Sequence, residues 1–201
     1  MAAKAGVGLQ DGLVLVLGWS AVGRVLAKLC RERSLEVVGV RAAEEVGERK
    51  EEGMEVVPLS ALDSLLPSAA ALLSCLPNTP RTVGLLDRRR PARLQPSAVL
   101  VNLGRAEVCD SAEVVQAVRA GRLAGAELDC WWHLASPAPT PLPNLDRLVL
   151  APCRTAQTSA EQETDLYSTV AEILRGVGQA GWGRRAGTVW RTTPLSPTTS
   201  S

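Results

Sequence analysis

The chain has 201 residues, of which 46% are hydrophobic and 21% are charged, and its net charge is +1. This length suits one domain with its own core, and the composition is that of a globular protein, not a disordered one. A net charge so close to zero gives no electrostatic reason to expect nucleic acid as a partner. With five Trp, one Tyr and no Phe, the core has to be built from Leu, Val and Ala.

The cysteines and the single histidine argue against a metal site. Cys30, Cys75, Cys109, Cys130 and Cys153 are widely spaced and form no Cys-x-x-Cys pair, so we predict no bound metal. The odd number of cysteines, together with a start that lacks the apolar core of a secretion signal, predicts reduced thiols in a cytoplasmic protein. No apolar run approaches the ~20 residues that a membrane-spanning helix needs, so we expect no membrane partner.

Short aliphatic runs alternate with helical patterns along most of the chain. The predicted strands are Leu13–Leu17, Glu36–Val40, a weaker one at Glu55–Val57, Ala71–Cys75, Ala98–Asn102, Gly125–Asp129 and Leu148–Leu150. The predicted helices are Ala21–Arg33, Leu59–Leu66, Ser111–Ala120 and Ser159–Gly176. For the third helix we predict Ser111 as the N-cap and Gly121 as the glycine that ends it. This alternation predicts an α/β fold with a doubly wound parallel sheet.

Three segments interrupt the pattern. Residues 44–53 are highly charged and predict a loop or a surface helix, whereas residues 135–144 contain four prolines and predict an extended loop. The tail from Thr192 is polar, which is typical of disorder. We therefore predict a short lead over residues 1–12, one domain over residues 13–178, and a partly disordered tail with Gly and Trp over residues 179–201.

The turn after the first predicted strand has most of a dinucleotide-binding signature. Gly18 and Gly23 stand at the first and third positions of Gly-x-Gly-x-x-Gly, and Ser20 stands at the second. A pyrophosphate needs backbone N–H groups at a helix N-terminus, so we assign it to these residues with Ala21 and Val22. Ser20 is small enough for the turn, and its hydroxyl can donate to a phosphate. The alternative that this turn binds no ligand stays open. A serine-hydrolase Gly-x-Ser-x-Gly elbow is excluded, because Val22 stands where its second glycine would be.

The end of the second predicted strand bears on the choice of cofactor. Sites for NAD usually have Asp or Glu about 20 residues after the turn, where it binds the ribose 2′-OH. Arg41 stands there instead, and an arginine suits a 2′-phosphate. The sequence therefore favours NADP(H), although Glu44 and Glu45 follow closely and keep NAD(H) open.

Four motifs in residues 72–158 point to one family. In chain order they are LLSCLPNTPRTVGLLD, LQPSAVLVNLGRAEVCD, AGRLAGAELD and LPNLDRLVLAPCRTAQT. As an ordered set they resemble the D-isomer-specific 2-hydroxyacid dehydrogenases, with the glyoxylate/hydroxypyruvate reductase branch as the nearest. The resemblance runs from about Leu13 to Gly178. It implies a single Rossmann-like NAD(P)-binding domain, oxidoreductase chemistry on small 2-hydroxy or 2-keto acids, and a homodimer.

The resemblance also implies roles for particular residues. The Leu-Pro-Asn-Thr turn would lie against the cofactor ribose, Arg105 would grip the carboxylate and carbonyl of the substrate, and Asp129 would bind the nicotinamide carboxamide. The cofactor-binding residues that it implies are Leu76, Pro77, Thr79, Leu103, Gly104, Arg105 and Asp129.

Two proton-handling residues of the family are not kept. The family histidine that exchanges a proton with the substrate oxygen falls on Cys153, and the glutamate that sets its pKa falls on Leu134. Neither replacement is suited to that proton transfer, so we predict that both positions are inactive. Because a positioned acid commonly contributes about 10² to 10⁴ in rate, we also predict that catalysis is weak or lost. His133, beside the glutamate position, is the alternative proton donor.

The start of the chain adds a second reason to expect weak catalysis. Family members fold a preceding segment into a substrate domain that faces the cofactor, and this sequence begins only shortly before its first predicted strand. The preferred hypothesis is therefore a cofactor-binding family member, a pseudoenzyme with weak or lost turnover. Two alternatives stay open. One is an active NADPH-dependent 2-keto acid reductase completed by a partner, and the other is an interaction protein that has lost the cofactor.

Overall fold

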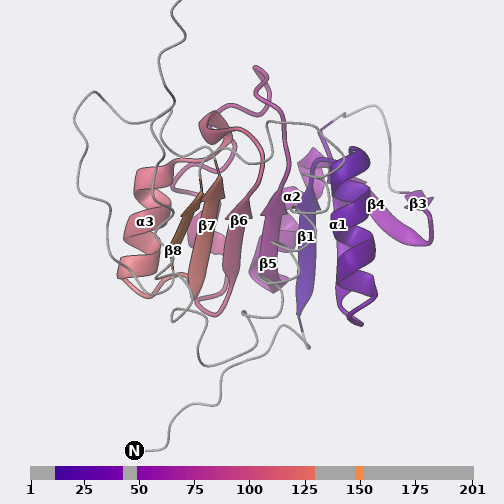
Figure 1. Ribbon diagram of the computed structural model, residues 1–201, viewed down its shortest axis with the longest axis horizontal. Helices are drawn as coiled ribbons and strands as arrows, with labels where there is room; N and C mark the ends of the chain where they lie inside the picture. The colour runs from indigo at the N-terminus through magenta and orange to yellow at the C-terminus, as the bar shows by residue number, and fades with distance from the viewer. Residues whose placement is uncertain (1–11, 43–48, 130–147, 152–201) are drawn as a thin grey trace, which may run out of the picture.

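A computed structural model describes residues 12–42, 49–129 and 148–151 of the chain, and strands from all three ranges join one sheet (Figure 1). The strands are β1 Leu13–Leu17, β2 Glu36–Arg41, β3 Arg49–Glu51, β4 Met54–Pro58, β5 Ala69–Ser74, β6 Val99–Asn102, β7 Gly125–Asp129 and β8 Leu148–Ala151. The α-helices of these residues are α1 Ala21–Arg31, α2 Leu62–Leu65 and α3 Ser111–Arg119. Short 3₁₀ turns lie at Leu59–Ala61, Leu66–Ser68, Pro91–Arg93 and Ala106–Val108.

The strand order is β3-β4-β2-β1-β5-β6-β7-β8. Every neighbouring pair is parallel except β3 and β4, which run antiparallel. From β1 the chain first builds outward through β2 and β4, and then returns to build the other half from β5 onward. This confirms the predicted doubly wound sheet. Its direction of growth reverses between β1 and β5, and open α/β sheets bind ligands at the carboxyl ends of the strands at such a point.

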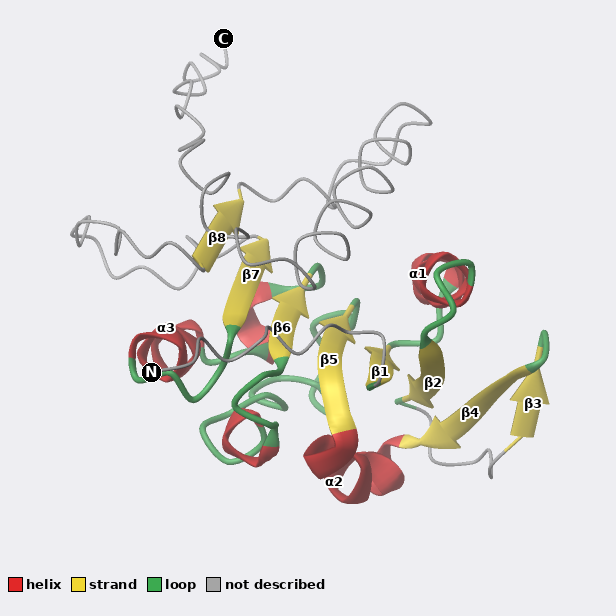
Figure 2. Cartoon of the chain, turned by 90° about the horizontal axis from the view of Figure 1, so that it is seen from below, coloured by secondary structure: helices red, strands yellow, loops and turns green. Residues whose placement is uncertain are grey.

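Helices cover both faces of the sheet. Figure 2 shows α1 on one face and α2 and α3 on the other. Successive side chains of a strand point to opposite faces. Accordingly, Leu15 and Leu17 of β1 join the core cluster under α2 and α3, whereas Val14 and Val16 join the cluster under α1. Strands covered on both faces consist of nearly continuous apolar residues, which is why their positions are readable from the sequence.

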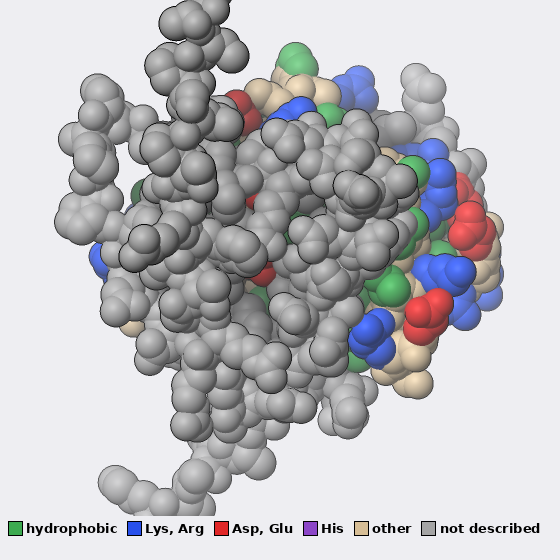
Figure 3. Space-filling view, viewed as in Figure 1, with side chains coloured by type: hydrophobic (Ala, Val, Ile, Leu, Met, Phe, Trp, Pro, Cys, Tyr) green, Lys and Arg blue, Asp and Glu red, His purple; other side chains and the backbone are tan. Residues whose placement is uncertain are grey.

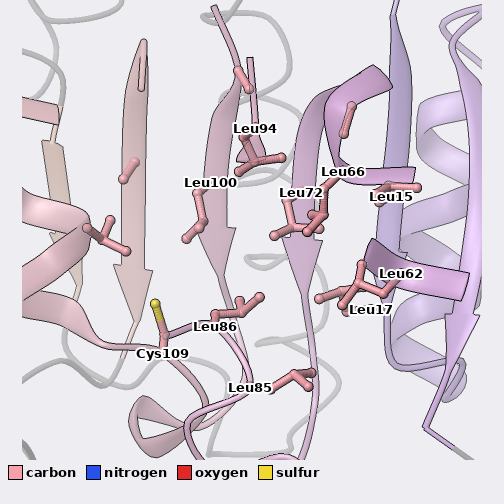
Figure 4. Packing of buried hydrophobic residues seen from close by; sticks show 14 of the residues in the cluster. Leu15, Leu17, Leu62, Leu66, Leu72, Leu85, Leu86, Leu94, Leu100 and Cys109 are labelled. Atoms are coloured by element: carbon pink, nitrogen blue, oxygen red, sulfur yellow. The ribbon is translucent and has the colours of Figure 1, made fainter. Parts of the chain in front are cut away.

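The larger cluster consists of aliphatic side chains, as the composition predicts. Leu15, Leu17 and Leu72 from the sheet lie with Leu62 and Leu66 from the segment around α2, and all five are completely buried (Figure 4). Burying a leucine side chain stabilises a fold by about 1.5–3 kcal/mol. This leucine layer therefore holds the segment around α2 against the sheet.

Three sequence predictions are corrected by the structure. The helix expected at Leu59–Leu66 is one turn of α-helix between two 3₁₀ turns, and the α-helix ends before Pro67, which has no N–H for the helical ladder. The N-cap of α3 is Asp110 and not Ser111, since the Asp110 carboxylate accepts a 3.1 Å bond from the Glu113 N–H. Within the charged segment 44–53, Arg49–Glu51 form strand β3. The helix predicted at Ser159–Gly176 lies outside the described residues.

A candidate dinucleotide-binding site

The turn between β1 and α1 is closely packed around its two glycines. Gly18 has a φ of +99°, and a Cβ built on it would lie 3.1 Å from the Cys75 carbonyl oxygen. A Cβ on Gly23 would lie 1.9 Å from the carbonyl oxygen of Gly18. The Gly18 N–H also donates to the Val40 carbonyl at 2.9 Å, which ties the turn to the end of β2. Glycine at both positions is therefore what allows α1 to begin directly over the end of β1.

Ser20 serves the turn as the N-cap of α1. Its hydroxyl oxygen accepts from the Gly23 N–H at 3.4 Å, and the helix begins at Ala21. Ser20, Ala21 and Val22 are exposed. A capping serine at this position leaves the helix N-terminus open to solvent, as an anion site there requires.

Cys75 lies beneath the turn and was not found by sequence reasoning. Its thiol donates to backbone carbonyls, with Sγ 3.0 Å from the Gly18 oxygen and 3.1 Å from the Leu17 oxygen. Burial raises the pKa of this thiol from 9.0 to about 11, and hydrogen bonds from the Ser20 side chain and the backbone offset only part of the rise. The thiol is therefore protonated at neutral pH and acts as a donor that supports the glycine turn.

Replacing Cys75 with Ala should change how stability depends on pH. Because the folded pKa is about 11 and the ordinary value is 9.0, the thiol of the unfolded chain ionises first as the pH rises. The contribution of the protonated thiol to the free energy of unfolding is therefore fully present below about pH 9 and is lost as the pH rises toward about 11. Relative to Cys75→Ala, the unfolding free energy of the wild type should fall by about 1.4 kcal/mol per pH unit. Urea titrations across this range measure the difference, and parallel curves would show that the folded thiol ionises normally.

The loop after β5 is held by a buried threonine. Leu76 is 2% exposed and Thr82 is 1% exposed, whereas Pro77 is at the surface. The Thr82 hydroxyl donates to the Pro77 carbonyl at 2.5 Å and accepts from the Thr79 N–H at 2.9 Å. These bonds fix the Leu-Pro-Asn-Thr turn at the carboxyl edge of the sheet.

The loop after β6 presents Arg105 at the same edge. The Asn102 side chain is 1% exposed; its amide donates to the Arg105 carbonyl at 3.1 Å and its oxygen accepts from the Gly104 N–H at 3.2 Å. The Arg105 N–H donates to the Leu76 carbonyl at 3.2 Å. A Cβ on Gly104 would lie 2.4 Å from that same oxygen. The backbone around Arg105 is therefore fixed by Asn102 and Leu76, while its side chain is exposed.

The sheet register places these loops side by side. Leu17 of β1 pairs with Ser74 of β5, Ser74 pairs with Asn102 of β6, and Asn102 pairs with Leu128 of β7. The next residue along the chain from each of these positions begins a predicted site segment or, at Cys75, directly precedes one. These four residues are Gly18, Cys75, Leu103 and Asp129. Parallel strands thus bring together the glycine turn, both loops and the buried Asp129, which is 2% exposed.

Arg41 lies at the end of β2, as predicted, but its guanidinium is already paired. Its Nη2 donates to the Glu51 carboxylate at 2.6 Å, and the two side chains are 27% and 23% exposed. The other Glu51 oxygen accepts from the Trp19 indole N–H at 2.6 Å. Glu51 escaped sequence reasoning because residues 44–53 predicted a loop or a helix, and only the pairing of β3 with β4 brings Glu51 to Arg41.

Other predicted positions lie outside the described residues, namely Glu44, Glu45, His133, Leu134 and Cys153. The described part of the chain has no group of three or more His, Cys, Asp or Glu side chains that could hold a metal ion. In residues 12–42, 49–129 and 148–151, no helix is long and apolar enough to cross a membrane.

Known proteins resemble this chain over most of its length. The D-3-phosphoglycerate dehydrogenase of Archaeoglobus fulgidus is 28% identical over 175 residues, which cover 84% of this chain and 31% of that protein. The glyoxylate reductase of Korarchaeum cryptofilum is 28% identical over 159 residues, covering 79% and 47%. A solved structure of a probable 2-hydroxyacid dehydrogenase from Rhizobium etli, in complex with NADP, HEPES and L(+)-tartaric acid, matches with a TM-score of 0.64. It is 25% identical, and the match covers 88% of this chain and 55% of that one.

The chain thus spans 31–55% of the length of these three proteins. The profile of the family described as "D-isomer specific 2-hydroxyacid dehydrogenase, NAD binding domain" matches residues 2–153, well over half of the chain. That match covers the glycine turn, both loops and Asp129. The chain belongs to the D-isomer-specific 2-hydroxyacid dehydrogenase family, of which it carries the NAD-binding domain.

Proposed function

We propose that this domain binds a nicotinamide dinucleotide, NADP(H) with NAD(H) as the alternative, for oxidoreductase chemistry on a small 2-keto or 2-hydroxy acid. Glyoxylate and hydroxypyruvate are the substrates that the resemblance favours, and turnover by this chain is weak or lost. A homodimer, as the family resemblance implies, is part of the proposal and is tested by light scattering.

One observation carries the cofactor part of the proposal. Gly23 leaves no space for a Cβ and Gly18 has a positive φ, and the two glycines put an exposed helix N-terminus at the switch point of a parallel sheet. Backbone N–H groups there can approach a pyrophosphate closely. Arg41 supports NADP(H), since a guanidinium can bind a 2′-phosphate through two parallel hydrogen bonds. The NADP in the Rhizobium etli structure is consistent with this preference.

The chemistry follows from the residues at the carboxyl edge. A reduced dinucleotide bound here would supply the hydride for reduction of the carbonyl carbon of the 2-keto acid and would itself be oxidised. Arg105, exposed at the edge, would hold the substrate carboxylate and draw electron density from its carbonyl. The oxygen that gains negative charge then needs a proton. The family positions for that proton transfer hold Leu134 and Cys153, which supports slow turnover; His133 is the remaining imidazole.

An NADPH titration followed by a turnover assay tests the proposal. We expect NADPH fluorescence to change with micromolar affinity, and glyoxylate or hydroxypyruvate turnover to fall at least about 10²-fold below that of an enzyme with a positioned acid. Binding without turnover supports the pseudoenzyme hypothesis. Fast turnover supports an active reductase instead, and its loss in His133→Ala would identify the proton donor. Absence of binding at millimolar NADPH and NADH would leave only the interaction-protein hypothesis.

A further inference from the structure

Glu51 joins the glycine turn to the end of β2. One carboxylate oxygen is 2.6 Å from Nη2 of Arg41, and the other is 2.6 Å from Nε1 of Trp19. Trp19 is the residue between Gly18 and Ser20 in the turn, and Arg41 is the last residue of β2. A single carboxylate therefore occupies the place where the dinucleotide fold distinguishes a ribose 2′-OH from a 2′-phosphate.

The hairpin of β3 and β4 holds Glu51 in this place. Glu51 pairs with Met54 across a tight turn in which Glu52 and Gly53 have φ of +50° and +75°. Arg31 of α1 donates to the Glu52 carbonyl at 3.3 Å. Figure 1 shows β3 at the edge of the sheet beyond β4, and Figure 3 shows basic and acidic side chains interspersed on that flank of the molecule. Backbone pairing and the contact with α1 thus fix the position of Glu51.

Trp19 fixes the direction from which Glu51 is bound. Its indole is 6% exposed, and its ring lies over Gly39 of β2, with ring carbons 2.3 Å from where a Cβ would stand. A ring held this firmly presents its N–H in one direction. The Glu51 carboxylate is therefore bound from one side by the turn and from the other by Arg41.

Arg41 is only partly satisfied by this arrangement. Among the described residues, its buried Nε has no hydrogen-bond partner, although Nη2 is bound to Glu51. A 2′-phosphate would have to share the guanidinium with Glu51 and would also meet its negative charge. A ribose 2′-OH, in contrast, can donate to the carboxylate and leaves the ion pair intact. Glu51 therefore opposes the preference that Arg41 gives to a 2′-phosphate.

We propose that Glu51 is a specificity-determining residue for the cofactor, acting against NADP(H) and for NAD(H) through its contact with Arg41. The proposal rests on the dinucleotide binding proposed above. The ratio of the affinities for NADPH and NADH then depends on a residue of the antiparallel edge hairpin. That hairpin lies outside the β1–α1–β2 unit, which contains the glycine turn and Arg41.

Affinities of the full chain for NADPH and NADH test this assignment. In Glu51→Gln, the preference for NADPH over NADH should rise by about tenfold, because a half-buried negative charge beside the 2′-phosphate is removed. The affinity for adenosine 2′,5′-bisphosphate should rise in parallel, and that for 5′-AMP should not. In an Arg41→Ala background the same replacement should shift the preference less, because only the direct repulsion between Glu51 and the 2′-phosphate is then removed and the competition for the guanidinium is absent.

Glu52→Gln is the matched control. It removes the same charge one residue further along, where the carboxylate is exposed and lies 4.0 Å from Arg24. It should leave the preference unchanged. If both dinucleotides bind but Glu51→Gln does not shift their ratio, the assignment fails while the proposed function stands. If the wild type binds neither and Glu51→Gln gains NADPH binding, the assignment is supported. If neither protein binds either dinucleotide, both proposals fail. If Glu51→Gln does not fold, the uncharged Glu51→Met, with a side chain of similar length, replaces it, and an unchanged ratio there also overturns the assignment.

Discussion

Gly23→Ala should weaken NADPH binding by roughly 10- to 100-fold, because a displaced helix N-terminus loses hydrogen bonds to the charged pyrophosphate, each worth about 1.5–3 kcal/mol. The added Cβ would lie 1.9 Å from the carbonyl oxygen of Gly18, which belongs to the backbone and cannot rotate away. Helix α1 would have to move off the end of β1, and its buried residues Leu26 and Ala27 would move with it. Overpacking of this kind also destabilises a fold by about 1–3 kcal/mol. Fluorescence titration with NADPH and thermal denaturation measure the two effects.

Gly84→Ala is the control for this replacement. Unlike Gly23, Gly84 has a positive φ, of +63°, but a Cβ there has nothing within 4 Å. The control should lose stability through backbone strain of about 1–2 kcal/mol and should bind NADPH like the wild type. Equal NADPH affinity in Gly23→Ala and the wild type would show that the turn does not hold the pyrophosphate.

Arg105→Ala should lower any 2-keto acid turnover by at least about 100-fold. In other enzymes, removing one group that stabilises the charge developing on the substrate has an effect of this size. The backbone of Arg105 is held by Asn102 and Leu76, whereas its side chain is exposed. Removing the guanidinium therefore leaves the loop in place and deletes only the group that would bind the substrate carboxylate. NADPH affinity should fall by a smaller factor than turnover, because the resemblance also counts Arg105 among the cofactor-binding residues. Turnover of glyoxylate and hydroxypyruvate at saturating NADPH measures the effect.

If wild-type turnover is below detection, the binding of oxalate to the NADPH-bound protein replaces it as the readout. Arg105→Lys keeps the charge but loses the planar fork of donors, so it should give an intermediate affinity. Arg93→Ala, at another exposed arginine, should have no effect. An unchanged oxalate affinity in Arg105→Ala would place substrate binding elsewhere on the chain.

Several elements of the fold were predictable because their residues are buried on both faces. Strands β1 and β7 have the predicted bounds, and α1 begins at the predicted Ala21. Continuous aliphatic runs, glycines and turn residues act within a few positions of one another, so their effects are visible locally. Strand β3 was not predicted, since its residues Arg-Lys-Glu have no apolar pattern and form a strand only by pairing with β4.

Within the site, the sequence located the groups that follow the strands but not their partners. Gly18, Gly23, Arg105 and Asp129 lie at the edge where the motifs place them. Cys75 was predicted only as the end of a strand, and its bonds to the backbone of the glycine turn connect residues 57 and 58 positions apart. No local pattern encodes a contact across that separation.

The sequence by itself thus determined the doubly wound sheet, the glycine turn and the order of the loops at its carboxyl edge, because aliphatic periodicity and backbone sterics act locally. Only the tertiary structure decided the surroundings of these groups. It placed Glu51 on Arg41 and Trp19 through the edge hairpin, the Cys75 thiol beneath the turn, and Asn102 as the clamp of the Arg105 loop. Each of these depends on strand pairing or on loops that meet across the sheet, and such contacts exist only once the chain has folded.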